Sequence, residues 1–169
     1  MKSLPRVAIA LGDPAGIGPE IALKAALDER VRAIAQPVLV GDFSALTLHA
    51  KLCGIPAPID TFASASEVQW REGRVPLIAR SHFATDQLEL GQIRPQHGRA
   101  ALDAAGCAIQ AAMDGFVDAV VAAPQTELAI KQAGVKFDGY PPFVSRRTAP
   151  PSCETFERHT AVGHHTAIG

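Results

Sequence analysis

The residues best suited to chemistry lie in a loop rich in glycine and proline, Gly12–Glu20, with the sequence GDPAGIGPE. Because glycine carries no Cβ, Gly12, Gly16 and Gly18 would let the backbone approach a ligand closely. A proline follows Gly18 where a helix would begin, and the free N–H groups of a helix start favour anionic groups. The alternative is a tight turn without a ligand. Spacing alone leaves two roles open for Asp13, a hydrogen-bond acceptor for the turn itself or a contact to substrate.

A second candidate segment, Pro124–Glu127, directly follows the apolar run VDAVVAA. Residues just past the carboxyl end of a parallel strand line the usual ligand crevice of an open α/β sheet, so Gln125 and Glu127 are candidates for that crevice. From composition alone, the favoured interpretation is an ordinary strand-to-helix turn in which Thr126 caps the helix.

A third segment, Phe137–Phe143, combines aromatic side chains with two prolines, which predicts a rigid loop. The residues themselves favour a turn that packs Tyr140 and Phe143 onto the core. The adjacent pair His164 and His165 shows no metal-ligand spacing, because on a strand the two side chains would point to opposite faces.

These segments need elements that position them, and the apolar patterning supplies candidates. Short apolar runs predict strands at residues 7–11, 36–40, 75–79 and 117–123. Helices are predicted at residues 20–27, 43–53, 99–116 and 128–132, and residues 91–98 are expected to form a loop. Because strands alternate with helices, we expect parallel pairing with helical crossovers and therefore an α/β fold.

The composition is that of one globular domain. The chain has 169 residues, 47% of them apolar, and 16 basic against 17 acidic side chains give a net charge of −1. A disordered chain is excluded, and general nucleic-acid binding, which needs a basic footprint, is not expected. No apolar run approaches the ~20 residues that span a bilayer, and the N-terminus lacks the apolar region of a signal peptide. Three widely spaced cysteines suggest neither a disulfide framework nor a zinc site, so we expect a reducing, cytoplasmic compartment.

Several motifs together resemble the 4-hydroxythreonine-4-phosphate dehydrogenase (PdxA) family. Residues 13–20 (DPAGIGPE) resemble its N-terminal signature, and residues 91–98 (GQIRPQHG) resemble its loop before a long helix. Residues 117–124 (VDAVVAAP) resemble the strand that follows, and residues 133–139 (AGVKFDG) the segment that carries its substrate loop. The resemblance covers about residues 7 to 144.

This resemblance implies an α/β/α fold related to isocitrate and isopropylmalate dehydrogenases, of which the chain would be an incomplete version. It also implies two domains, a homodimer, NAD or NADP, and a divalent metal of the Zn, Mg, Co or Mn class. The implied chemistry is oxidation of a secondary alcohol in a small hydroxy acid by hydride transfer, followed by decarboxylation, with the metal polarising the oxygen. Neither a nucleic acid nor a membrane is an expected partner.

Two departures from the family pattern concern the substrate. Glu127 stands where enzymes for phosphorylated substrates have a lysine, and Gly139-Tyr140-Pro141 stands where they have Gly-His-Thr, whose His and Thr contact substrate. Both changes resemble the branch that oxidises cyclic cis-dihydrodiol carboxylates, as in terephthalate dihydrodiol dehydrogenases. The resulting candidates are Tyr140, Pro141 and Asp13 for substrate binding, and Gly12, Gly16, Gly18, Gln125 and Glu127 for the crevice.

Length is the third departure, because family members are about twice as long, which fits two domains. The family-like region is residues 1–144, and residues 145–169 do not match at the family's spacing, so we expect a frameshifted or disordered tail. The family's metal ligands lie beyond the matching region, His165 is the one candidate ligand in the tail, and no catalytic residue can be assigned. The chain alone is therefore expected to be inactive, and a non-catalytic α/β fragment is the alternative.

Overall fold

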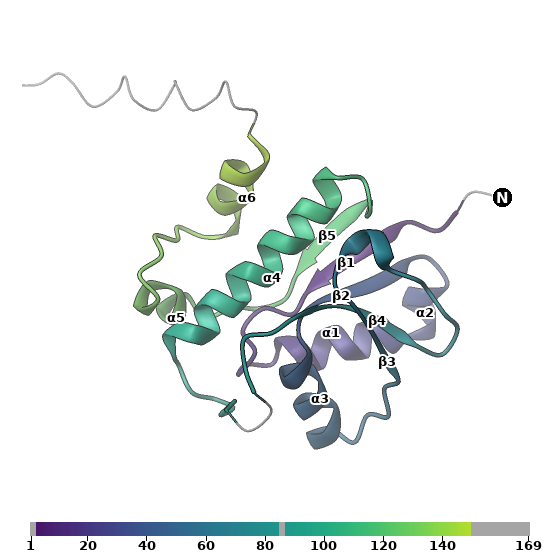
Figure 1. Ribbon diagram of the computed structural model, residues 1–169, viewed down its shortest axis with the longest axis horizontal. Coiled ribbons are helices and arrows are strands. Elements are labelled where there is room, and N and C mark those ends of the chain that lie inside the picture. Colours follow the sequence, from purple (N-terminus) through teal and green to yellow (C-terminus); the bar gives the residue numbers. More distant parts are fainter. Residues whose placement is uncertain (1–2, 85–86, 150–169) are drawn as a thin grey trace, which may run out of the picture.

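The computed structural model describes residues 3–84 and 87–149, which form a parallel five-stranded sheet with helices on both faces (Figure 1). The strands are β1 (Arg6–Ala10), β2 (Gln36–Asp42), β3 (Ile59–Phe62), β4 (Val75–Arg80) and β5 (Ala119–Ala122). Their order across the sheet is β3-β4-β2-β1-β5, and every neighbouring pair is parallel. The expected α/β class is confirmed.

The helices form two layers, one on each face of the sheet. They are α1 (Gly18–Leu27), α2 (Glu29–Arg32), α3 (Phe43–Leu52), α4 (Pro95–Met113), α5 (Glu127–Gln132) and α6 (Tyr140–Thr148), with a 3-10 turn at Ala65–Glu67. Helices α1 and α3 lie on one face and α4 covers the opposite face, which makes the α/β/α arrangement (Figure 1). Within the described ranges, no helix is both long and apolar enough to cross a membrane.

Alternate residues of the central strands supply the two apolar cores. In β1 and just beyond it, Ala8 and Ala10 pack in the cluster that includes α4, whereas Ile9 and Leu11 pack in the cluster that includes α1 and α3. Successive side chains of a strand point to opposite faces, so a strand buried on both faces must be apolar throughout. This is why the runs at residues 7–11 and 36–40 were recognisable in the sequence.

Three elements escaped the sequence analysis, namely α2, β3 and α6, and the boundaries of several others moved, most of all those of α4 and β5. The edge strand β3 has the sequence IDTF and no buried residue, so it lacks a continuous apolar run. Helix α4 begins at Pro95, inside the segment expected to be a loop, because proline is tolerated in the first turn of a helix. Strand β5 keeps only four of the seven residues predicted for it.

The segment Phe137–Phe143 is a loop only up to Gly139, and the expectation of a loop across all of it was wrong. Gly139, with a φ of +99°, ends the loop, and α6 begins at Tyr140 with prolines in its first turn, where no intrahelical N–H is needed. Phe143 is buried, as the packing interpretation predicted.

The boundary placed after Val144 falls inside α6. Residues 145–148, which the sequence analysis assigned to the tail, complete this helix. The remainder of the expected tail, from residue 150 and including His165, lies outside the described residues.

The connections between strands create a reversal point at β1. From β1 the chain passes through α1 to β2 and on to β3 and β4, whereas α4 carries it back over the other face to β5, on the far side of β1. In open α/β sheets, ligands bind outside the carboxyl ends of the strands where the winding direction reverses. The segments at this point are Gly12–Glu20 after β1 and Pro124–Glu127 after β5.

Candidate functional site

Two segments that the sequence singled out separately meet at the reversal point. The backbone N–H of Asp13 donates to the Pro124 carbonyl at 3.0 Å, and the Thr126 hydroxyl donates to the Asp13 carboxylate. The carboxyl ends of β1 and β5 are therefore joined through backbone and side chain. One surface results, formed by the glycine loop on one side and residues 124–127 on the other.

Asp13 is a structural acceptor in this arrangement. Its side chain is only 5% exposed, one carboxylate oxygen accepts from the Ala15 N–H at 2.9 Å, and the other accepts from Thr126. Of the two roles left open by the sequence, these contacts support the acceptor that stabilises the turn. Burial of a carboxylate is tolerable because both oxygens have donors.

The three glycines of the loop differ in how much space surrounds them. A Cβ on Gly12, whose φ is +70°, would lie 2.2 Å from the Pro124 carbonyl oxygen, and a Cβ on Gly18 would lie 2.1 Å from the Leu11 carbonyl oxygen. These two positions require glycine because protein backbone, rather than a ligand, approaches them. A Cβ on Gly16 would only make an ordinary contact with Asp13, at 3.5 Å. Gly16 is therefore the one of the three at which space remains.

Two further contacts fix the glycine loop from outside. The Nε2 atom of the buried His49 lies 3.0 Å from the Pro14 carbonyl oxygen, and the N–H of Gly91 donates to the Ala15 carbonyl at 2.8 Å. The loop is thus held before any ligand arrives, which lowers the entropic cost of binding. No pattern in the sequence indicates this role of His49, because a lone histidine inside an apolar helix pattern is more simply interpreted as a core residue.

The turn after β5 differs from the expected helix cap. Thr126 occupies the N-cap position of α5, but its side chain makes no capping hydrogen bond and turns to Asp13 instead, so the predicted cap was wrong. The Oε1 atom of Gln125 is buried and has no hydrogen-bond partner within the described part of the chain. Glu127 is exposed in the first turn of α5, where the helix dipole favours an acidic side chain.

Tyr140 belongs to the same end of the sheet. Its hydroxyl donates to the Ala123 carbonyl at 3.3 Å, and its ring lies edge-on to Phe137 with centroids 6.0 Å apart. Burial raises the pKa of Tyr140 to about 12, so the phenol is neutral at physiological pH. Pro141, the other substrate-binding candidate, is exposed beside it in the first turn of α6.

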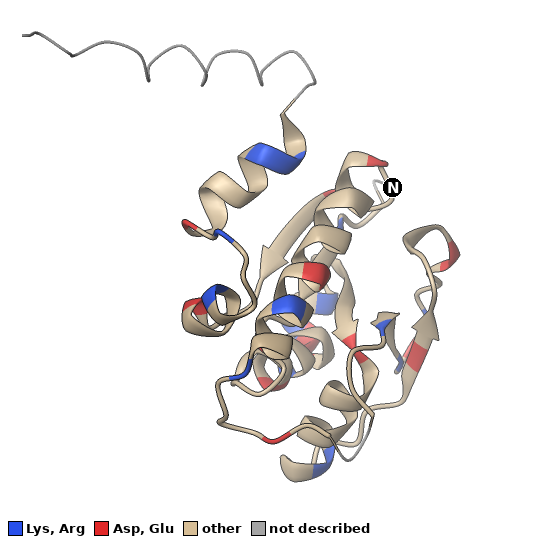
Figure 2. Cartoon of the chain, turned by 60° about the vertical axis from the view of Figure 1, so that its left-hand side comes forward, with Lys and Arg blue, Asp and Glu red and all other residues tan. Residues whose placement is uncertain are grey.

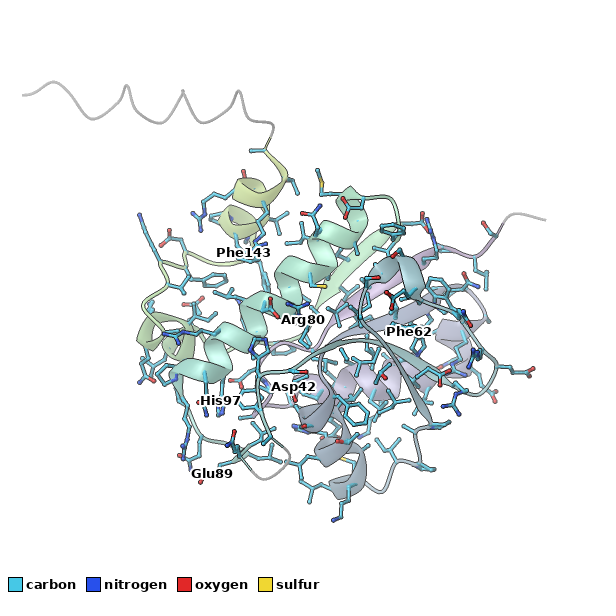
Figure 3. All side chains as sticks on the ribbon, viewed as in Figure 1. Asp42, Phe62, Arg80, Glu89, His97 and Phe143 are labelled. Carbon is cyan, nitrogen blue, oxygen red and sulfur yellow. The ribbon has the colours of Figure 1, made fainter. Side chains whose placement is uncertain are left out.

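A polar cluster beyond β4 was not found from the sequence. Arg80, labelled in Figure 3, ends β4. It binds Asp103 of α4 through two hydrogen bonds, of 2.6 and 3.1 Å, and Nε2 of His82 lies 2.9 Å from the same carboxylate. Burial raises the pKa of Asp103, but the hydrogen bonds from Arg80 and His82 outweigh it and hold that pKa below its usual value. Position at or just after the end of a strand was the one signal that could have indicated Arg80 and His82, whereas Asp103, in the middle of α4, carries no such signal.

Asp42 links this cluster to the rest of the carboxyl edge. One oxygen of its buried carboxylate accepts from the Ala45 N–H at 3.0 Å and caps α3. The other accepts from the backbone N–H groups of His82 and Phe83, at 2.7 and 3.2 Å. The segment that follows β4 is therefore tied to the end of β2.

The described residues do not supply a metal site. Residues 3–84 and 87–149 hold no group of three or more His, Cys, Asp or Glu side chains placed to hold a metal ion. These described residues therefore do not fit the divalent metal that the family resemblance implies. His165 lies outside the described residues.

Comparisons with known proteins agree with this architecture. A family model described as pyridoxal phosphate biosynthetic protein PdxA matches residues 33–164. A curated relative from Symbiobacterium thermophilum, named "Putative D-threonate 4-phosphate dehydrogenase", is 34% identical over 140 residues, which cover 83% of this chain and 42% of the relative.

Several solved structures are similar to the chain, and two of them represent the two kinds of enzyme. A 4-hydroxythreonine-4-phosphate dehydrogenase from Burkholderia phymatum has a TM-score of 0.81 and 28% identity, covering 86% of this chain and 44% of that one. A terephthalate 1,2-cis-dihydrodioldehydrogenase from Burkholderia xenovorans LB400 has a TM-score of 0.67 and 34% identity, covering 89% and 42% respectively. The chain thus spans less than half the length of these proteins.

Proposed function

The chain belongs to the family of pyridoxal phosphate biosynthetic protein PdxA, and we propose that it contributes to a nicotinamide-dependent dehydrogenase that oxidises the hydroxyl of a small hydroxy acid. The relatives described above are named as dehydrogenases. The observation that carries the proposal is the junction of Gly12–Glu20 with Pro124–Glu127 at the reversal point of the sheet, where folds of this kind bind ligands.

When bound, NAD or NADP would supply the hydride acceptor for oxidation of the substrate hydroxyl, and the β-keto acid formed would then lose carbon dioxide. The chain's own part is to bind and orient. The first turn of α1, whose leading N–H groups have no intrahelical partner, would suit an anionic group of cofactor or substrate. The N–H groups of Asp13, Ala15 and Gly16 are already bonded to the Pro124 carbonyl or to Asp13, so the loop contributes its shape. Tyr140 and Pro141 remain the proposed substrate-binding residues, whereas Asp13, predicted with them from the sequence, would contribute indirectly by holding the shape of the loop.

A second candidate substrate class is a cyclic cis-dihydrodiol carboxylate. Glu127 places a negative charge where a lysine would bind a phosphate. The Tyr140 hydroxyl donates its hydrogen bond to the Ala123 carbonyl, so it does not donate to a phosphate. Losing two charge-assisted hydrogen bonds of roughly 1.5–3 kcal/mol each would weaken phosphate binding by about two to four powers of ten. Sequence identity does not separate the two classes, because the terephthalate enzyme and the relative named D-threonate 4-phosphate dehydrogenase are both 34% identical to the chain, so this candidate rests on Glu127 and Tyr140.

The substrate is tested with a catalytically active protein that contains this chain together with the remaining part of the family's fold. We expect kcat/KM to favour a non-phosphorylated carboxylic diol over 4-phosphohydroxythreonine, and Glu127→Lys to reduce that preference. A clear preference of the unaltered protein for the phosphorylated compound would contradict this assignment. It would instead favour a phosphorylated hydroxy acid as the substrate.

A non-catalytic fragment is the alternative function for the chain alone, since it spans 42% of the curated relative. We expect no formation of reduced nicotinamide when candidate substrates, cofactor and divalent metals are added to the purified chain. Turnover that survives repurification would show that residues 1–169 suffice. A cytoplasmic location and a homodimer also remain proposals, supported by family membership.

A further inference from the structure

An apolar pocket lies at the amino ends of the strands, the end of the sheet opposite the candidate site. Its volume is about 250 Å³. Its walls come from the first residues of β2 and β4 and from the segments that lead into β1, β2 and β4. We call it the amino-end pocket, and its lining includes Leu4, Arg32, Pro37, Trp70, Glu72 and Pro76. None of the candidate site residues belongs to this lining.

One wall of the amino-end pocket is an aromatic ring held in one orientation. The Trp70 indole N–H donates to the Pro37 carbonyl at 3.1 Å, and the partly buried ring also packs against the core cluster that includes α4. Pro37 and Pro76, each the second residue of its strand, complete the apolar wall together with Leu4. Because aromatic rings pack best against other planar groups, this fixed wall favours a ligand with a planar, apolar body.

A guanidinium that the backbone holds in place lines the same pocket. Arg32, the last residue of α2, donates from Nε to the Ala26 carbonyl at 2.7 Å and from Nη2 to the Arg74 carbonyl at 2.8 Å. None of the ion pairs between described residues involves Arg32. A guanidinium carries five N–H donors, so these two bonds leave donors for a ligand. Since the carbonyls already fix this partly buried cation, an anion would bind it at a low entropic cost.

The other charges around the pocket leave a net positive charge. Arg74 binds the Asp60 carboxylate, with Nε 2.6 Å from Oδ1, and Nη1 of Arg71 lies 3.7 Å from Oδ2 of the same carboxylate. Glu72 is the acidic residue of the lining. Three arginines against Glu72 and Asp60 give an excess of one positive charge. Basic and acidic residues are interspersed over much of the fold (Figure 2), so this excess is not part of a general basic surface.

We propose that the amino-end pocket binds a small aromatic carboxylate, with the ligand ring against Trp70 and the ligand carboxylate on Arg32. A guanidinium and a carboxylate form paired, charge-assisted hydrogen bonds. The volume of about 250 Å³ lies below the roughly 300–1,000 Å³ of pockets for drug-sized ligands, so the pocket suits a single ring and not a nucleotide. The pocket and the loop Gly12–Glu20 lie at opposite ends of the sheet, so the proposal does not rest on the proposed activity.

Benzoate is the probe for this pocket, titrated into the full 169-residue protein. Trp70 is the single tryptophan of the chain, so its fluorescence reports on the pocket alone, and isothermal titration calorimetry gives the stoichiometry. We expect a saturable change in emission with one site per chain. Benzamide keeps the ring without the charge, and acetate keeps the charge without the ring. Each should bind about tenfold more weakly or less, because each loses one of the two contacts. Inorganic phosphate should not saturate the signal.

Two substitutions test the two proposed contacts. Arg32→Gln should weaken benzoate binding about tenfold or more, because it removes the charge, whereas Arg32→Lys should retain part of the affinity. Trp70→Leu, measured by calorimetry, should weaken benzoate binding about two- to tenfold, because the ring loses its aromatic partner. If circular dichroism shows that Arg32→Gln does not fold, the series of probes and Trp70→Leu decide the question.

A matched control separates the pocket from general charge effects. Arg30 lies on the same helix as Arg32, but its side chain is 91% exposed and lies outside the pocket, so Arg30→Gln should leave the affinity unchanged. The proposal is overturned if benzoate gives no saturable binding up to about 10 mM, which is weak even for a small ligand. It is also overturned if benzamide or acetate binds as tightly as benzoate, or if Arg30→Gln weakens binding as much as Arg32→Gln.

Discussion

The Thr126 hydroxyl donates a hydrogen bond to the Asp13 carboxylate across a separation of 113 residues in the sequence. The two residues follow different strands, β1 and β5, and their contact closes the surface at which the winding of the sheet reverses. Thr126, which the sequence analysis assigned to a helix cap, therefore links two separate segments instead. The shape of the candidate site depends on this pair.

Thr126→Val should lower the free energy of unfolding by about 1.5–3 kcal/mol, because it leaves a buried, charged acceptor without its donor. Thr126→Ser keeps the hydroxyl and should recover most of that loss. Urea unfolding at neutral pH measures both variants. Thr47→Val is the control, since that hydroxyl bonds only to carbonyls of its own helix and should matter little. Equal stability of the Val and Ser variants would show that the hydrogen bond contributes nothing.

The glycine loop offers a matched pair of substitutions. Gly18→Ala should destabilise the protein by roughly 1–3 kcal/mol, since the new Cβ would lie 2.1 Å from the Leu11 carbonyl oxygen and the backbone must move. Gly16→Ala adds a methyl group at ordinary contact distance and should change stability by less than about 0.5 kcal/mol. Thermal unfolding of the two variants decides the point, and a Gly16→Ala variant as unstable as Gly18→Ala would contradict this account of the loop.

Tyr140 is the single tyrosine of the chain, so its ionisation can be followed by ultraviolet absorbance without interference from another phenol. Burial raises its pKa to about 12. Because the unfolded chain releases this proton near pH 10, it binds fewer protons than the folded chain above that pH, and stability should fall as pH rises from about 10 towards 12. Phenolate absorbance appearing near pH 10 in the folded protein would show that the hydroxyl is not buried.

The central fold was predictable because it follows from continuous apolar runs. Strands β1, β2 and β4 are buried on one or both faces, and their sequences carry no polar interruption. The edge strand β3 has no such run. Helix α6 begins with a tyrosine and two prolines, which are typical of a loop, and only the tertiary contact of Phe143 indicates a packed helix. Elements stabilised by one-sided or tertiary packing therefore escaped the pattern.

The candidate site was predictable as two segments but not as one surface. Glycines and a following helix marked Gly12–Glu20, and position after a strand marked Pro124–Glu127. The two segments meet because β5 pairs with β1. That pairing joins residues far apart in the sequence, so no local sequence pattern predicts it. The inter-strand role of Thr126, the support from His49 and the cluster around Asp103 were missed for the same reason, because each acts through a partner distant in the sequence.

The Asp103 carboxylate should make acid stability depend on its two partners. Arg80 and His82 hold its pKa below the usual value despite the opposing effect of burial, so at acid pH the unfolded chain binds this proton more readily than the folded chain. The stabilisation is complete above about pH 4, the ordinary range of an aspartate, and is lost as pH falls through the lowered pKa. Asp103→Asn should therefore cost about 1 kcal/mol at neutral pH, a modest value because the side chain is 33% exposed. The difference from the unaltered protein should shrink as the pH is lowered below 4.

Urea unfolding at several pH values measures this, with Asp114→Asn, an exposed residue just beyond the same helix, as the control. A cost that stays constant with pH would mean that Asp103 stabilises the fold through its shape and not through its charge.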